Sequence, residues 1–171
     1  PAFPFAPCVP FGRERSGVLF RAGAYEAPPD EMLTRIEAVF ELAGPQVLRY
    51  ADARRGQRRA ARLTRQGQDT RVEAFLLAGD TRAEAWLRTL LQEERPAQAY
   101  GRLLLAPGAK APVALASRGR QVCTCFNVSE PGIVAELAGC AGDDAARLEQ
   151  LQSRLRCGTN CGSCIPELKR L

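Results

Sequence analysis

The string that decides the fold of the C-terminal part is Arg156-Cys-Gly-Thr-Asn-Cys-Gly-Ser-Cys-Ile-Pro166. It places three cysteines within eight residues. A second string, Gln121-Val-Cys-Thr-Cys-Phe-Asn-Val128, adds a pair in C-x-C spacing. Spacings this short favour metal binding in a reducing compartment over a disulfide framework. Together the two strings indicate a tetrathiolate metal site.

The residues alone leave the metal open. Two iron atoms bridged by two sulfides take two thiolates each, so two local cysteine pairs suit a 2Fe-2S cluster. Four cysteines satisfy a tetrahedral zinc ion equally well, and disulfides are a distant third. The chain has no histidine, so any metal must be held by sulfur or carboxylate. Gly158 and Gly162 would let backbone N–H groups approach the sulfurs of a cluster, which would raise its reduction potential.

The composition is that of a globular protein, with 46% hydrophobic and 25% charged residues in a chain of 171. The most apolar stretch, 103–116, is interrupted by proline, glycine and lysine and falls short of the roughly 18 apolar residues that a spanning helix needs. We therefore expect a cytoplasmic protein without a membrane partner. Pro1–Pro10 lacks an initiator methionine and the features of a signal peptide, so the chain is expected to begin inside a longer polypeptide.

Residues 1–105 are predicted to form a small α+β domain. A helix is expected to begin at Pro29-Asp30 and to end at Gly44-Pro45. Three segments between turns then have the pattern of antiparallel strands, namely Gln46–Asp52, Gln57–Thr64 and Thr70–Ala78. Thr81 and Glu84 have the spacing of a capping box for a second helix, whose apolar stripe should pack on the sheet.

Residues 106–120 are rich in alanine, proline and glycine and are predicted to be a linker. Residues 121–171 are predicted to be a small, mostly helical domain. Its helices should start at Ser129-Glu130, at Asp143 or Asp144, and with Pro166 in the first turn. A domain of this size has too small an apolar core to be stable without a metal staple.

Seven arginines lie between Arg54 and Arg71, and the net charge is +5. Such a run raises the question of an acidic partner or a nucleic acid. Aromatic residues do not interleave with these arginines as they do in single-stranded nucleic acid sites, so a solvated strand face is the favoured interpretation. We expect no nucleic acid partner.

Residues 122–171 resemble the bacterioferritin-associated-ferredoxin-like 2Fe-2S domain. The resemblance is to the version that ends assimilatory nitrate reductases and recurs within NADH-dependent nitrite reductases. It is carried by Val122-Cys-Thr-Cys-Phe-Asn-Val and by Cys157-Gly-Thr-Asn-Cys-Gly-Ser-Cys-Ile-Pro-Glu-Leu. The resemblance implies a 2Fe-2S cluster with four ligands, which are Cys123, Cys125, Cys161 and Cys164. Cys157 is not expected to ligate, and Cys8 and Cys140 have no assigned role.

Residues 47–92, with Tyr50-Ala-Asp-Ala-Arg-Arg-Gly and Leu77-Ala-Gly-Asp-Thr, are similar to the small domain that precedes this cluster in both groups of enzymes. They also resemble the C-terminal domain of flavin-dependent rubredoxin reductases. As a whole, the chain resembles the C-terminal region of bacterial assimilatory nitrate reductase catalytic subunits. This implies a molybdenum-dependent oxidoreductase of nitrate assimilation, whose 4Fe-4S centre and molybdopterin guanine dinucleotide belong to an upstream part. No catalytic residue is then expected in this segment.

The same resemblance implies two kinds of partner. Electrons would come from a donor, which is a flavoprotein reductase, a ferredoxin or a flavodoxin, and would pass to the upstream catalytic domains of the same enzyme. Three alternatives stay open. The first is the flavoprotein subunit of nitrite reductase, in which the chain is expected to continue past the cluster. The others are a ferredoxin that docks on bacterioferritin for iron release, and an adaptor stapled by zinc.

Overall fold

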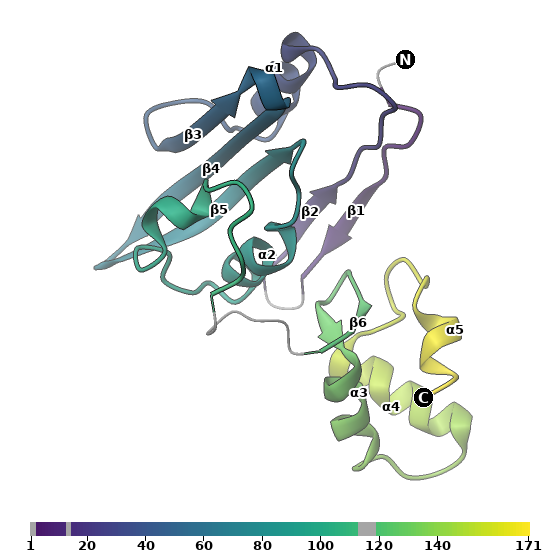
Figure 1. Ribbon diagram of the computed structural model, residues 1–171. Coiled ribbons are helices and arrows are strands. Elements are labelled where there is room, and N and C mark those ends of the chain that lie inside the picture. Colours follow the sequence, from purple (N-terminus) through teal and green to yellow (C-terminus); the bar gives the residue numbers. More distant parts are fainter. Residues whose placement is uncertain (1–2, 13–14, 113–118) are drawn as a thin grey trace. The chain divides into compact units, whose positions relative to one another are not determined.

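The computed structural model describes residues 3–12, 15–112 and 119–171 (Figure 1). The chain divides into two compact units. Unit 1 comprises Pro1–Pro4 and Gly23–Ala116, and unit 2 comprises Phe5–Ala22 and Ser117–Leu171. Small antiparallel sheets combine with short helices, which confirms the predicted α+β class. Within the described ranges, no helix has the length and apolar character needed to cross a membrane.

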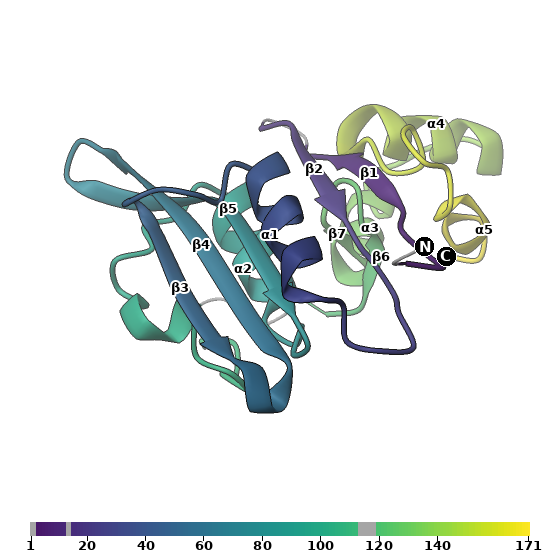
Figure 2. The same ribbon diagram turned by 90° about the horizontal axis from the view of Figure 1, so that it is seen from above.

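Unit 1 is built on an antiparallel sheet of three strands in the order β3-β4-β5. The strands are β3 (Val47–Asp52), β4 (Gln57–Gln66) and β5 (Asp69–Ala78). Both ribbon views show β4 between its two neighbours (Figures 1 and 2). The short 3-10 helix η1 (Ala53–Arg55) joins β3 to β4 and ends at Gly56 in the left-handed region. The predicted meander is thus confirmed.

Two helices accompany this sheet. In α1 (Asp30–Val39), the buried Glu37 accepts two hydrogen bonds from the Arg58 guanidinium of β4, at 2.7 and 2.8 Å. Helix α2 (Glu84–Gln92) packs on β5 and buries the apolar stripe predicted from the sequence, namely Trp86, Leu87, Leu90 and Leu91. A second 3-10 helix, η2 (Gly101–Leu104), follows.

The helix boundaries differ from the sequence prediction at two places. Helix α1 ends at Val39, because Glu41 takes a left-handed φ of 54° and turns the chain well before Gly44. At α2 the predicted capping box does not form, since the N-cap residue is Ala83 and makes no side-chain capping bond. Thr81 contributes only its carbonyl, which accepts from the Glu84 N–H at 2.9 Å.

A buried ion pair explains the altered turn before α2. The Arg59 guanidinium lies 3.1 Å from the Asp80 carboxylate, and both side chains are almost fully buried. Asp80 also accepts from the Arg82 side chain and from the Gly108 N–H, while Arg59 donates to the Ala106 carbonyl. The beginning of the predicted linker 106–120 is therefore bonded to unit 1. Positions 113–118 of that linker lie outside the described residues.

We expect Asp80→Asn to destabilise unit 1 at pH 7. Hydrogen bonds from Arg82 hold the pKa of the Asp80 carboxyl well below its usual value of 3.8, so the ionised form stabilises the folded state above that pH. As the pH falls below 3.8 toward the lowered pKa, this contribution is lost, and the difference between variant and wild type should shrink. Urea unfolding followed by the fluorescence of Trp86, the one tryptophan, reports on unit 1 at each pH.

The control for this prediction is Glu26→Gln, which removes an exposed carboxylate of the same unit. Its urea midpoint should stay close to that of the wild type at pH 7. A midpoint of Asp80→Asn that equalled the control at pH 7 would show that the buried pair contributes nothing to folding.

Unit 2 combines segments from both ends of the chain. The N-terminal hairpin consists of β1 (Cys8–Phe11) and β2 (Gly17–Phe20). The C-terminal part contains the elements β6 (Gln121–Cys123), β7 (Val128–Ser129), α3 (Glu130–Leu137), α4 (Asp144–Leu155) and α5 (Ile165–Leu168). The sequence prediction placed the hairpin in the domain 1–105, whereas the structure groups it with the cysteine-rich segment. The Gly12 N–H donates to the Cys125 carbonyl, and the Asn160 side chain donates to the Pro10 carbonyl.

Candidate metal centre

The first cysteine string is positioned by the β6–β7 hairpin. Cys123 ends β6 opposite Val128, and Cys125 lies in the turn between the strands. The tight turn requires a left-handed residue, which is Asn127 with φ 53°. The Asn127 side chain accepts a hydrogen bond from Gln121 at 2.6 Å, and this bond closes the hairpin. The Val128 side chain is buried in the same apolar cluster as Cys123 and Cys125, so both cysteines of the C-x-C pair are packed against the core.

The second string begins where α4 ends. Arg156 leaves the helix in the left-handed region with φ 57°, and its N–H still donates to the Gln152 carbonyl. The loop then passes Gly158, where a φ of 82° would strain any side chain and a Cβ would lie 3.1 Å from the Ile165 side chain. Cys164 caps α5, the last helix. This loop therefore returns the chain toward β6 within a few residues.

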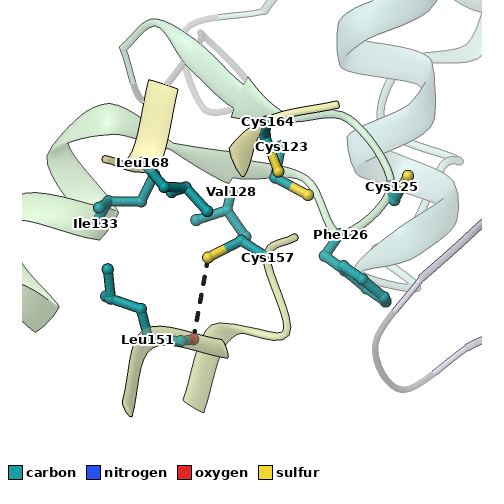
Figure 3. Packing of buried hydrophobic residues seen from close by; sticks show 9 residues of the cluster. All are labelled: Cys123, Cys125, Phe126, Val128, Ile133, Leu151, Cys157, Cys164 and Leu168. Carbon is teal, nitrogen blue, oxygen red and sulfur yellow. Dashed lines mark hydrogen bonds between the residues drawn. The ribbon is translucent and has the colours of Figure 1, made fainter. Parts of the chain in front are cut away.

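The structure brings the sulfurs of the four predicted ligands into contact across the two strings. Cys125 Sγ and Cys161 Sγ lie 3.2 Å apart, and the Cys123 and Cys164 thiols are close neighbours. Figure 3 shows the Cys123 and Cys164 sulfurs side by side. The sequence argument had grouped the sulfurs by local pairs, one for each iron. In the structure, the contacts run between the strings instead.

Burial differs among these four cysteines. Cys123, Cys125 and Cys164 are buried, whereas Cys161 is exposed. Burial raises the pKa of the Cys125 thiol and, together with the neighbouring Cys123, raises that of Cys164 to about 12. A hydrogen bond with the Ser163 hydroxyl, at 3.1 Å, lowers the pKa of Cys161. A bound metal would supply the positive charge that the buried thiolates need.

The other three cysteines take different positions. Cys157 is fully buried, and its sulfur points toward the Leu151 carbonyl at 3.9 Å (Figure 3). Cys140, three residues after the end of α3, donates to the Glu136 carbonyl of that helix at 3.4 Å, and Cys8 is exposed on β1. Their predicted status as bystanders stays a prediction.

The donor set can be compared with what each metal requires. Within residues 3–12, 15–112 and 119–171, no three cysteine or acidic side chains are arranged as ligands of one ion. The four thiols form two contacting pairs, and a 2Fe-2S cluster takes two thiolates on each iron. The Gly158 backbone lies near Cys164 and acts against the rise of its thiol pKa. In number, type and pairing, the residues fit a 2Fe-2S cluster.

Two contacts that the sequence did not predict join the strings. The Arg156 guanidinium lies over the Phe126 ring, 5.1 Å from its centroid. Arg120, just before β6, forms ion pairs with Glu130 of α3 and Glu167 of α5. The first contact links the turn after Cys123 to the start of the second string, and the second links the residue before β6 to α3 and α5. Charge and aromatic type were visible in the sequence, but the pairing was not.

Comparison with known proteins agrees with this geometry. Residues 121–171 match the family described as the BFD-like 2Fe-2S binding domain. A nitrate reductase of Klebsiella oxytoca is 46% identical over 76 residues, which cover 44% of this chain and 8% of the relative. The large subunit of an NAD(P)H nitrite reductase of the same organism is 39% identical over 59 residues, covering 34% of this chain and 6% of the relative.

The chain thus spans less than a tenth of the length of either relative. No solved structure gave a significant match. The matched family covers the whole segment that carries both cysteine strings. At its C-terminus, this chain carries a member of the BFD-like 2Fe-2S binding domain family.

Proposed function

We propose that this chain is the electron-transfer region of a molybdenum-dependent assimilatory nitrate reductase. The observation that carries the proposal is the similarity to a nitrate reductase over 76 residues, more than the 51 residues of the matched domain. The similarity therefore includes residues outside the cluster domain. Its identity of 46% is higher than the 39% found with the nitrite reductase.

In this proposal, Cys123, Cys125, Cys161 and Cys164 hold the cluster. A bound 2Fe-2S cluster supplies single-electron transfer, because its irons change oxidation state one electron at a time. The protein binds and orients it, and three of the four thiols lie in a dry environment. The exposed Cys161 marks the side on which a donor could approach closely.

The partners belong to the same proposal. A flavoprotein reductase, ferredoxin or flavodoxin would deliver electrons, and upstream domains with a 4Fe-4S centre and molybdopterin guanine dinucleotide would receive them. A cytoplasmic location follows from the proposed role in nitrate assimilation and from the reduced thiols that the site requires.

The first test concerns the cluster itself. Chain purified without oxygen should be brown, should contain about two irons and two sulfides, and should bleach in part with dithionite. Iron and acid-labile sulfide analysis, with the visible spectrum, measures this. Stoichiometric zinc in chain produced with ample iron would instead support the zinc adaptor.

The second test concerns nitrate. In the longer polypeptide that contains this chain, Cys161→Ser should stop nitrate reduction by the physiological donor. Reduction by a viologen dye that supplies electrons directly to the upstream centres should continue. Loss of both activities would contradict a role confined to electron delivery.

The similarity to the nitrite reductase favours a second candidate, the corresponding region of a nitrite reductase flavoprotein. The two candidates differ in the metal of the whole enzyme. Molybdenum in the purified longer polypeptide supports the first, whereas sirohaem with nitrite-reducing activity supports the second.

A further inference from the structure

The N-terminal hairpin is bonded to both cysteine strings. The Gly12 N–H, directly after β1, donates to the Cys125 carbonyl at 2.7 Å. The Asn160 side-chain amide donates to the Pro10 carbonyl at 2.7 Å. Asn160 immediately precedes Cys161, whose sulfur lies 3.2 Å from that of Cys125. The hairpin is therefore bonded to Cys125 itself and to the residue next to Cys161.

The hairpin also contributes apolar surface. Val9 of β1 packs against the buried cluster that contains Cys123, Cys125 and Cys164. Phe11, at the end of β1, is only 7% exposed. Apolar groups beside a metal site restrict the access of water and thereby affect both its stability and its potential. Val9 and Phe11 both lie outside the matched family segment, residues 121–171.

The turn of the hairpin demands glycine. Gly12 has φ 100°, and a Cβ at this position would lie 1.8 Å from the Arg15 carbonyl oxygen. A side chain here would have to displace the backbone that carries the bond to Cys125. At the other strand, a Cβ on Gly17 would lie 2.6 Å from the Phe11 ring. A side chain at either glycine would therefore force its neighbours to shift.

We propose that the hairpin β1–β2 is part of the cluster site, where Gly12 and Asn160 are positioning residues that hold Cys125 and Cys161 and retain the cluster. The inference rests on cluster binding by this chain and is independent of the nitrate reductase proposal. The proposed functional unit then draws on residues 5–12, 15–22 and 119–171, which come from segments far apart in the sequence.

Release of iron to a chelator tests the role of these residues. Loaded chain is mixed with excess chelator, and the decay of the visible absorbance gives the rate. Gly12→Ala should release iron roughly ten- to hundredfold faster than the wild type, as is typical when residues supporting metal ligands are lost. Asn160→Ala removes one hydrogen bond and should release it about three- to tenfold faster. Visible circular dichroism should change in both, since it senses the ligand geometry.

Each variant has a matched control. Gln150→Ala removes a side-chain amide bond to a backbone carbonyl of the same length, 2.7 Å, between α4 and Ala141. Gly67→Ala places a side chain on a left-handed glycine of unit 1, where a Cβ would meet nothing within 4 Å. Both controls should release iron at the rate of the wild type.

Hydrogen exchange gives a readout that needs no variant. If the hairpin belongs to the cluster site, iron loading should slow amide exchange in peptides from Cys8–Phe20 as well as from Gln121–Leu168. Peptides from β4 and β5 should be unchanged. The proposal would be overturned if iron loading left amide exchange in the hairpin unchanged and all four variants released iron at the same rate. A wild-type chain that took up no iron would overturn cluster binding itself, and its colourless spectrum would show this first.

Discussion

Replacing Cys161 with serine is expected to remove the visible absorption of the iron-loaded chain. A serine hydroxyl is a poor substitute for a thiolate on iron, and loss of supporting residues alone reduces metal affinity by about 10–100-fold. Cluster content should therefore fall by more than about tenfold. Because Cys161 is exposed, serine should be tolerated by the fold, so the loss of iron can be assigned to the ligand. Iron and sulfide per chain measure the effect.

Matched controls separate ligands from bystanders. Cys8 is exposed like Cys161, and Cys8→Ser should keep the cluster. Cys157 is buried like Cys123 and Cys164, and Cys157→Ser should keep iron although Cys123→Ser and Cys164→Ser lose it. Cys125→Ser should lose it, and Cys140→Ser should not. Retention in Cys161→Ser together with loss in Cys157→Ser would show that the ligand assignment is wrong.

The grouping of the cysteines was accessible from the sequence because short spacings leave few alternatives. Cys123 and Cys125 are separated by one residue, so any hairpin that positions one also positions the other. The contact between Cys125 and Cys161 depends on how α4 and α5 return the chain, and spacing does not specify this. The two local cysteine pairs could therefore be predicted from the sequence. Which sulfur of one pair contacts which sulfur of the other could be seen only in the structure.

The sheet of unit 1 was predictable for a similar reason. Its strands are neighbours in the sequence and are joined by short turns, so the order β3-β4-β5 needs no distant information. The hairpin β1–β2 is the opposite case. Asn160 bonds to the Pro10 carbonyl across 150 positions, and a backbone carbonyl leaves no signature in the residue type. No pattern in the sequence could have placed the hairpin at the cysteines.

The arginine run shows how structure changes the design of an experiment. Arg58 pairs with the buried Glu37, and Arg62 pairs with Glu41 and Glu73. Part of the positive charge is thus neutralised within unit 1, and Arg59 is buried against Asp80, so the run does not form one solvated strand face as the sequence had favoured. Reversing Arg58 to glutamate would place two carboxylates together and would disturb α1. A test of donor docking on this face should use the exposed Arg54 and leave Arg58 intact.

Removing the iron is expected to loosen unit 2 while unit 1 stays folded. Among the described residues of unit 2, the buried cluster around the cysteines has nine members, and four of them are cysteines, so few large apolar side chains remain to stabilise it. Three of those cysteines are predicted ligands, whose thiolates would lose their counter-charge with the metal. Unit 1 has its own core around Leu42 and its own buried ion pairs, none of which involves a predicted ligand.

Trypsin cleavage can report on the folding of each unit separately, because both units contain arginines. After chelation, cleavage at Arg147 and Arg154 of α4 should become about a hundredfold faster, the factor by which a ligand at a hundred times its dissociation constant protects a fold. Cleavage at Arg59 and Arg88, both buried in unit 1, should stay slow. Reloading with iron and sulfide should restore the protection and the colour together. Protection restored by zinc without colour would favour the adaptor, and equal resistance with and without iron would mean that unit 2 folds without a metal.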